Sequence, residues 1–268
     1  MPEGDTIFRA AKTLDRWLRG REVTGARTQV DRLPAHKLVG QRVESAEARA
    51  KHLLIRFSSG AVLHTHMKMT GSWHVYRAGE RWQKPASQAR LVLEAGERIA
   101  VCFNAPVVEL LSARGEHLHP GLVNLGPDVL RPPVDLAEVR RRAAALSPSA
   151  TIGELLLAQQ VVSGIGNIWR CESLFVQRLD PFTPRHQIDD GSLDELVTVA
   201  SQMMQKAARP NEYVGRDFGG GMDKPWVYGR SRRPCRRCGT PIEVRSLGSP
   251  LPRAVYWCPT CQVRSRTT

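Results

Sequence analysis

The sequence lacks any long apolar segment and is poor in acidic side chains. No apolar run approaches the ~20 residues that a helix needs to cross a bilayer. The start of the chain does not fit a secretion signal either, because Glu3 and Asp5 stand where basic residues would be expected. Internal repeats and low-complexity tracts are absent as well. These absences predict a folded cytosolic protein with no membrane association.

The deficit of acidic residues leaves a strongly basic chain. Its 268 residues include 39 Lys and Arg against 26 Asp and Glu, a formal net charge of +13. The basic residues are spread along the chain, and a folded surface of this kind attracts polyanions, of which nucleic acid is the commonest. The alternative is a solvated basic face on an ordinary enzyme.

The pattern of apolar residues changes twice along the sequence. Residues 5–19 have helical periodicity, with Asp5 or Thr6 as N-cap and Gly20 as the stop. Short apolar or alternating runs then predict strands up to about residue 125, in a β-sandwich or barrel. These runs are HLLIRF, AVLHTHM, SWHVY, RLVLEA and RIAVCF. A proline-rich linker (126–135) is followed by helical patterns, and the last forty residues are arginine-rich and short-stranded.

Two cysteine pairs predict a metal site near the end of the chain. The pairs are Cys235-x2-Cys238 and Cys258-x2-Cys261, with nineteen residues between them. Four thiolates fill the tetrahedral sphere of one zinc ion and leave no position for a reacting water, so the predicted zinc is structural. The other two cysteines, Cys102 and Cys171, are expected to be buried apolar thiols.

The segment between the pairs predicts a hairpin with Ile242 and Val244 on one strand and Val255 and Trp257 on the other. Arg253 follows the bend, where a metal-stapled hairpin would hold a guanidinium suited to phosphate. A solvated surface arginine is the alternative. Five more arginines lie between residues 230 and 237.

A glycine-containing turn joins two helical patterns in TIGELLLAQQVVSGIGNIWRCESLFVQR. Gly164 and Gly166 can let backbone amides face outward, and a helix that begins at Asn167 adds its partial positive charge. Such a turn can hold a phosphate without reading the base sequence. Asn167 as a simple N-cap is the alternative. Ile165, between the glycines, is expected to pack inward.

Four separated stretches resemble the formamidopyrimidine-DNA glycosylase/endonuclease VIII family of base-excision repair enzymes. They are MPEG, the lysine in RAKHLLIRF, QQVVSGIGNIWRCESLF, and VYGR…PCRRCG…RAVYWCPTCQ. The resemblance implies an α+β fold in four parts, with DNA bound between the halves. The parts are an N-terminal catalytic β-sandwich with the first helix (1–125), a linker (126–135), a helical domain with a helix–two-turn–helix (136–228), and a zinc finger hairpin with four cysteine ligands (229–268).

The resemblance also implies the chemistry of the chain start. Removal of Met1 exposes Pro2, whose amine attacks C1′ of the damaged nucleotide. A free α-amine titrates near about 7.7–8.0, so on the order of a tenth is nucleophilic at pH 7. As a secondary amine, proline can give only a cationic iminium, which drives β-elimination of the 3′-phosphate. The family adds a second elimination that releases the 5′-phosphate.

Further roles follow by position from the same resemblance. Glu3 is the acid that protonates the sugar ring oxygen. Lys51 contacts phosphate and assists catalysis, while Asn167 and Arg253 hold a phosphate from the turn and from the hairpin. Without its companion motifs, Lys51 would be taken for an ordinary strand lysine that faces water.

Met69 falls where the family places an apolar wedge that fills the space of the everted base. Methionine in a strand is usually a core residue, which is the alternative. The sequence departs from both branches here. CFNAPVVELL lacks the arginine–phenylalanine pair of the oxidised-purine branch, and Lys68-Met69-Thr70 replaces the Gln-Leu-Tyr of endonuclease VIII. The PEG start is more similar to endonuclease VIII, which favours oxidised pyrimidines as substrates.

The expected partner is double-stranded DNA with damaged bases or abasic sites, bound by a monomer in the bacterial cytoplasm near the nucleoid. Two other functions fit parts of the sequence. A non-catalytic zinc-ribbon protein could bind damaged or bent DNA, but it has no need of a processed proline terminus. An RNA-handling zinc protein would need an aromatic stacking platform, and none is evident.

Overall fold

The computed structural model describes residues 2–209, 216, 218, 224–248 and 251–263. The chain divides into two compact units, Met1–Val123 and Asn124–Thr268, which are described separately. Within the described ranges, no helix combines the length and the hydropathy of a membrane-spanning segment.

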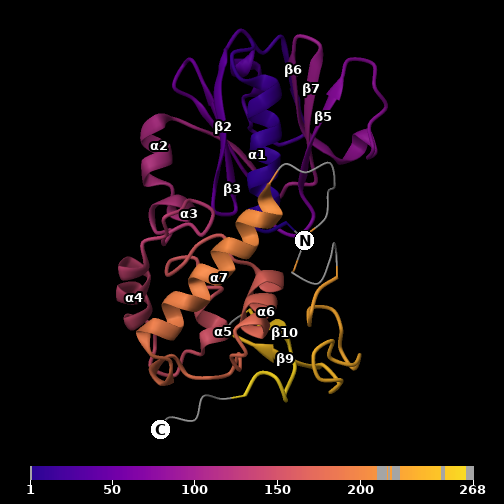
Figure 1. Cartoon of the computed structure of the whole chain (residues 1–268). Helices are drawn as coiled ribbons and strands as arrows, with labels where there is room; N and C mark the ends of the chain where they lie inside the picture. Colours follow the sequence, from indigo (N-terminus) through magenta and orange to yellow (C-terminus); the bar gives the residue numbers. More distant parts are fainter. Residues whose placement is uncertain (1, 210–215, 217, 219–223, 249–250, 264–268) are drawn as a thin grey trace. The chain divides into compact units, whose positions relative to one another are not determined.

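Unit 1 is built from two four-stranded antiparallel sheets (Figure 1). The order of strands is β2-β3-β4-β8 in the first sheet and β1-β6-β7-β5 in the second. Their bounds are β1 Gly25–Thr28, β2 Val43–Arg49, β3 His52–Phe57, β4 Val62–His66, β5 Ser72–Arg77, β6 Ala89–Ala95, β7 Arg98–Phe103 and β8 Val107–Leu111. The five predicted strands are therefore confirmed to within a residue or two, and β1, β2 and β8 are additions.

Helix α1 (Gly4–Leu18) contacts both sheets of unit 1. Its N-cap is Glu3, so the prediction of Asp5 or Thr6 as the cap is wrong. Thr6 instead completes the cap from inside the first turn, because its Oγ1 accepts the Glu3 N–H at 2.8 Å. Gly20, at φ +77°, ends the helical segment as expected.

The core of unit 1 lies between the sheets and under α1. The inward face of the helix contributes Ile7, Ala11, Leu14 and Leu18, as its periodicity predicts. The strands contribute a larger apolar set: Leu53, Ile55, Phe57, Leu63, Leu91, Leu93, Ala100 and Cys102. Cys102 is fully buried, so the prediction of a buried apolar thiol is confirmed, and burial raises the pKa of this thiol. Two short helices, α2 (Ala113–Leu118) and α3 (Pro120–Val123), end the unit.

Unit 2 is helical, with one long helix that its neighbours pack against (Figure 1). The helices are α4 Leu136–Ala144, α5 Ile152–Leu155, α6 Asn167–Val176 and α7 Asp190–Ala208. The short 3-10 helices of the whole chain are η1 Ala35–Leu38, η2 Ala86–Gln88 and η3 Arg185–Gln187. The segment 126–135 packs into this unit: Val129 is fully buried, and its carbonyl accepts the Ser201 hydroxyl at 2.6 Å.

The first helix of the helix–turn–helix is much shorter than the pattern TIGELLLAQQVV predicts. Thr151 and Glu154 form a capping box, but α5 ends at Leu155. The apolar residues that follow still pack inward, since Leu156, Val161 and Val162 are all buried. They reach the core from successive turns instead of from one helix face.

The chain ends in a two-stranded hairpin of β9 (Glu243–Leu247) and β10 (Arg253–Trp257). Val255 and Trp257 pack with Ile242 against Cys171 and Phe175 of α6. Val244 is exposed and does not belong to this cluster. The mixed α+β class, with an N-terminal β-sandwich and a terminal cysteine hairpin, is confirmed.

Candidate functional site

The start of the chain places a proline and a buried carboxyl group directly before α1. Pro2 is half-buried, and Glu3 is 1% exposed. The other end of the helix is fixed to β2 at two points: the Gly20 N–H donates to the Val43 carbonyl at the start of the strand at 2.7 Å, and Asp15 Oδ1 accepts the Ala46 N–H in its middle at 2.9 Å. Helix and strand run in opposite directions from there, so Pro2 and Glu3 lie toward the end of β2.

Lys51 lies at this same end of the sandwich, in the turn between β2 and β3. The strand position predicted for it is therefore shifted by one residue into the turn, which Ala50 makes possible at φ +55°. The charge of Lys51 also affects the pKa of His66, the last residue of β4. Burial, followed by the positive charges of Lys68 and Lys51, lowers the pKa of His66 to about 4.

Met69 projects from the β4–β5 turn, which is at the same end of the sheet because His66 pairs with His52. The side chain is 51% exposed, so the alternative of a core methionine is wrong. The turn is tight: a Cβ on Gly71 would lie 2.7 Å from the Met67 Cα. The Thr70 hydroxyl donates to the Asn104 carbonyl at 3.1 Å and fixes the turn to the end of β7. An exposed apolar side chain thus stands on a constrained turn.

The glycine turn of unit 2 is organised by a glutamine that the sequence did not point to. The Gln159 amide accepts the Gly164 N–H at 3.1 Å and donates to the Ile165 carbonyl at 3.0 Å. Gly164 has φ +98°, which explains the glycine, but its N–H is directed to Gln159 and not outward as predicted. Ile165 is fully buried, as expected. Gly166 is the N-cap of α6, so the alternative of Asn167 as N-cap is wrong.

Asn167 is held in place from two sides. Its Nδ2 donates to the Ala254 carbonyl of β10 at 2.8 Å, and its Oδ1 accepts from the Arg170 Nη2 at 2.5 Å. Arg170 is fully buried, and the same Nη2 lies 3.2 Å from the Ala254 carbonyl and 3.4 Å from the Arg253 carbonyl. The start of α6 and the start of β10 are therefore bound to each other, with Asn167 between them.

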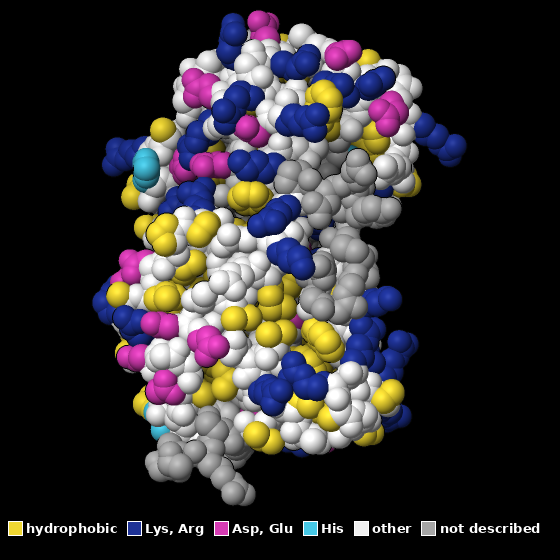
Figure 2. All heavy atoms as spheres, viewed as in Figure 1, with side chains coloured by type: hydrophobic (Ala, Val, Ile, Leu, Met, Phe, Trp, Pro, Cys, Tyr) yellow, Lys and Arg dark blue, Asp and Glu magenta, His cyan; other side chains and the backbone are white. Residues whose placement is uncertain are grey.

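Arg253 is exposed at the first position of β10, next to this contact. Two of the arginines in residues 230–237 make contacts within unit 2. Arg230 is buried and donates to the carbonyls of Trp226 and Pro234 at 2.7 and 2.8 Å. The Arg237 guanidinium lies 4.4 Å from the centre of the Phe175 ring. These two are structural. Other basic side chains are scattered over the viewed faces of both units, among apolar and acidic ones (Figure 2).

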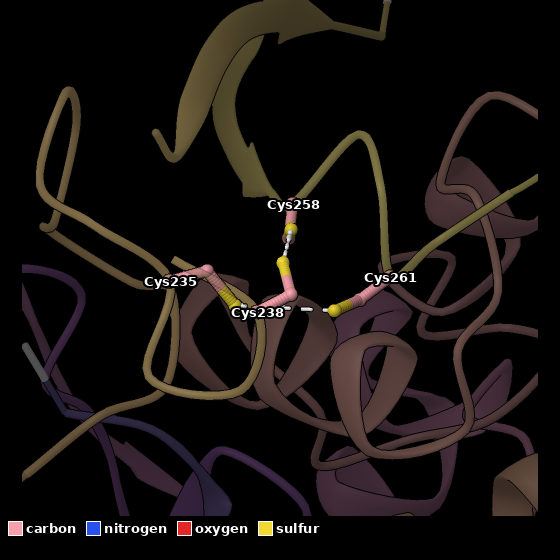
Figure 3. Close-up of side chains that lie close together, drawn as sticks. All are labelled: Cys235, Cys238, Cys258 and Cys261. Carbon is pink, nitrogen blue, oxygen red and sulfur yellow. Dashed lines mark hydrogen bonds between the residues drawn. The ribbon is translucent and has the colours of Figure 1, made fainter. Parts of the chain in front are cut away.

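The four paired cysteines converge as their spacing predicts (Figure 3). The Sγ atoms of Cys235 and Cys261 are 4.0 Å apart, and those of Cys238 and Cys258 are 3.4 Å apart. Sulfurs bound at about 2.3 Å to one tetrahedral ion lie about 3.8 Å from each other, so the set fits a metal ion. Cys171 is fully buried under the hairpin, which confirms the expectation of a core thiol.

Arg170 and Gln159 are the residues that sequence reasoning missed. A charged residue three positions after Asn167, in a helix with only one other charged residue, was the available signal. The signal for Gln159 was weaker, because its role depends on the conformation of the loop.

Family models match both units. Residues 1–106 match the formamidopyrimidine-DNA glycosylase N-terminal domain, and residues 125–216 match the formamidopyrimidine-DNA glycosylase H2TH domain. The fold agrees with a solved structure of Lactococcus lactis Fpg in complex with DNA that contains an abasic site. That likeness has a TM-score of 0.81 at 20% identity and covers 98% of this chain and 100% of the other.

Two curated relatives are similar over nearly their whole length. The probable endonuclease 8 2 of Streptomyces coelicolor is 38% identical over 264 residues, which is 98% of this chain and 94% of the relative. The DNA-(apurinic or apyrimidinic site) lyase Nei2 of Mycolicibacterium smegmatis is 34% identical over 265 residues, which is 99% and 100%. The chain therefore belongs to the formamidopyrimidine-DNA glycosylase/endonuclease VIII family of DNA-repair glycosylases and abasic-site lyases.

Proposed function

We propose that this enzyme removes oxidised bases, chiefly pyrimidines, from double-stranded DNA and cuts the strand through an iminium formed by Pro2. One observation carries the proposal. Pro2 and the buried Glu3 precede α1 at the same end of unit 1 as Lys51 and the exposed Met69. An amine, an acid, a cation and an apolar side chain are the groups that such chemistry needs.

The reaction begins when the neutral Pro2 nitrogen attacks C1′ of the damaged nucleotide. Glu3 protonates the sugar ring oxygen, the ring opens, and the base leaves with a proton. The product is a cationic iminium between Pro2 and C1′, which acidifies the C2′ proton. Loss of that proton expels the 3′-phosphate, a second elimination expels the 5′-phosphate, and water releases the proline.

The other groups hold the DNA. We assign Lys51 to a phosphate beside the reacting sugar, and Asn167 and Arg253 to a phosphate held from unit 2. The link through Arg170 supports this assignment, because it keeps Asn167 beside the start of β10. A fixed amide and a guanidinium cost little conformational freedom when they bind an anion.

Met69 is assigned to the space that the everted base leaves in the duplex, which an exposed apolar side chain on a constrained turn can fill. Gly164 and Gly166 shape the turn before Asn167. The cysteine set is assigned one structural zinc ion, because four thiolates select zinc and leave no open position.

The preference for oxidised pyrimidines rests on the PEG start and on the absence of an arginine–phenylalanine pair in CFNAPVVELL. The test uses untagged protein and duplexes that each carry one lesion: an oxidised pyrimidine, an oxidised purine or an abasic site. We expect nicking and borohydride trapping to be fastest with the abasic site and the oxidised pyrimidines. Faster turnover of oxidised purines would contradict the substrate assignment, and binding without nicking of any duplex would contradict the enzyme assignment.

A further inference from the structure

Half of the chain's eight histidines gather in one place in unit 1, outside the groups assigned to the reaction. The His64 ring lies 5.0 Å from the His52 ring and 4.8 Å from the His119 ring, and His66 packs edge-on against His52 at 4.7 Å. Their elements are β3, β4 and the junction of α2 and α3. Four imidazoles lie close together in a chain that already carries a net positive charge, and this clustering calls for a chemical explanation.

Glu109 on β8 contacts two histidines of the cluster. Strand pairing places it directly opposite His64. Its Oε1 lies 2.6 Å from the His64 Nδ1 and 2.8 Å from the His119 Nε2. The three donor atoms all lie within 4.8 Å of one another, close enough for one ion to reach all three.

We propose that His64, Glu109 and His119 form a second metal site, which takes one divalent transition-metal ion of the zinc type. Two imidazoles and one carboxylate are a ligand set that zinc uses when it keeps an exchangeable position, whereas Mg²⁺ and Ca²⁺ prefer oxygen ligands. The His64 side chain is 1% exposed and gives a fixed ligand, while Glu109 at 38% and His119 at 20% leave a route from solvent.

The surroundings of His64 suit a metal ligand. Its Nε2 lies 2.8 Å from the His52 Nδ1. With a metal ion on Nδ1, the ring keeps its proton on Nε2 and donates it to His52. A hydrogen bond from the second ring nitrogen orients most metal-bound histidines.

Binding has two identifiable costs. Glu109 Oε1 has to move away from both ring nitrogens, because ligands of one tetrahedral zinc ion lie about 3.3 Å apart. The second cost is at His119. Its Nδ1 accepts the Gly121 N–H at 3.1 Å at the start of α3. A metal ion on Nε2 moves the ring proton to Nδ1, where it would oppose the Gly121 N–H. The proposal therefore predicts that ion binding breaks this hydrogen bond, and the Gly121 amide reports on it.

Three protein ligands and an exchangeable position also predict a more labile ion than the one expected at the four cysteines. A brief treatment with a chelator should remove it while the cysteine site keeps its metal. The proposal is independent of the reaction assigned to Pro2, because none of its ligands takes part in that chemistry.

The test counts ions per chain in the full-length protein by native mass spectrometry, during titration with Zn²⁺ and then Co²⁺. Variants Glu109→Gln and His119→Gln each remove one ligand, and His117→Gln is the matched control, an exposed histidine two residues from His119. We expect two ions in the wild type and the control, and one in the ligand variants. The second Co²⁺ should add no thiolate charge-transfer absorption.

Binding of a single ion by the wild type at saturating Zn²⁺ would overturn the proposal, and would leave Glu109 as a hydrogen-bond acceptor that joins β4 and β8 to the end of α2. Retention of the second ion in both ligand variants would overturn it equally. A readout on the wild type alone covers variants that fail to fold: the NMR cross-peak of the Gly121 amide should shift on the second equivalent of Zn²⁺. An unchanged cross-peak would count against His119 as a ligand.

Discussion

The two units of this enzyme hold their candidate functional side chains in place in different ways. In unit 2, Asn167, Arg170 and the start of β10 hold one another through hydrogen bonds, and four cysteines converge on one point. In unit 1, Pro2, Lys51 and Met69 come from three separate segments, each positioned by its own helix start or turn. In the proposed function, unit 2 holds the DNA with fixed side chains, and unit 1 supplies the reacting groups. Substitutions in unit 2 should therefore change binding or folding, and those in unit 1 should change chemistry.

The largest effect is expected at Pro2. Extra residues fused ahead of Met1 remove the free imino group, so cleavage and borohydride trapping should fall by at least about a hundredfold. Pro2→Gly should weaken both, because a primary amine gives an imine that can lose its charge. The control carries the same fusion at the C-terminus. Undiminished trapping by the N-terminal fusion would show that Pro2 is not the reacting amine. Unit 1 would then lose the chemical role that sets it apart from unit 2.

In unit 2 the largest effect is expected at Cys258, which is fully buried. Cys258→Ser should lower the metal content by one ion per chain and expose the hairpin to protease, because metal binding supplies much of the folding free energy of such small modules. Ion counting and limited proteolysis check this. A variant that keeps both its ion and its protease resistance would show that the hairpin does not depend on the metal.

Arg253→Ala separates binding from folding in the same module. Its side chain is exposed and ligates no metal, so the melting temperature should stay within a degree or two of the wild type. Cleavage of duplex DNA should fall about tenfold to a hundredfold, because a hydrogen bond to a charged group contributes about 1.5–3 kcal/mol. Arg141→Ala, an exposed arginine of α4, is the control. Unfolding as severe as that of Cys258→Ser would contradict the division between structural and binding residues.

Met69→Ala tests the apolar turn of unit 1. Activity should fall about tenfold to a hundredfold, in line with about 1.5–3 kcal/mol for burial of such a side chain in the complex. The free energy of unfolding should not change, because the side chain is exposed in the free protein. Leu118→Ala, at another exposed apolar residue of unit 1, should leave activity unaltered. Loss of stability without loss of activity would make Met69 a structural residue.

The smallest effect concerns the stability of unit 1. Arg56 donates to both carboxylate oxygens of the buried Glu116, and this hydrogen bonding lowers the Glu116 pKa. The native state then holds fewer protons than the unfolded state, so the stabilisation is complete above the ordinary carboxyl pKa and is lost as pH falls through the lowered value. Glu116→Gln should cost about 1–2 kcal/mol at pH 7. Urea unfolding should show the gap to the wild type closing on acidification, and a constant gap would refute the ionic origin.

The strands between residues 52 and 103 could be predicted because apolar and β-branched residues dominate them. Strand β2, with the sequence VESAEAR, could not, because alanine and glutamate favour strands poorly and a register shift after Val43 breaks the alternation. Helix α5 was overestimated because its apolar residues remain buried after the helix ends. The spacing of apolar residues indicates which side chains are buried. Side chains can be buried without belonging to one continuous helix.

The same distinction holds for the sites. The cysteine set was predictable because each pair is local in sequence. Arg170 was not, since its partners on β10 are more than eighty residues away. The histidine cluster depends on the β4–β8 pairing, which places His64 opposite Glu109, and no local pattern encodes that register.

The claim on which the account depends is that the iminium forms on the imino nitrogen of Pro2. Untagged protein is reduced with borohydride on a duplex with an abasic site, digested with protease and nuclease, and sequenced by tandem mass spectrometry. The account predicts that the nucleotide remnant lies on the peptide that begins at Pro2, on its terminal nitrogen. A remnant on Lys51, or on any other side chain, would contradict it.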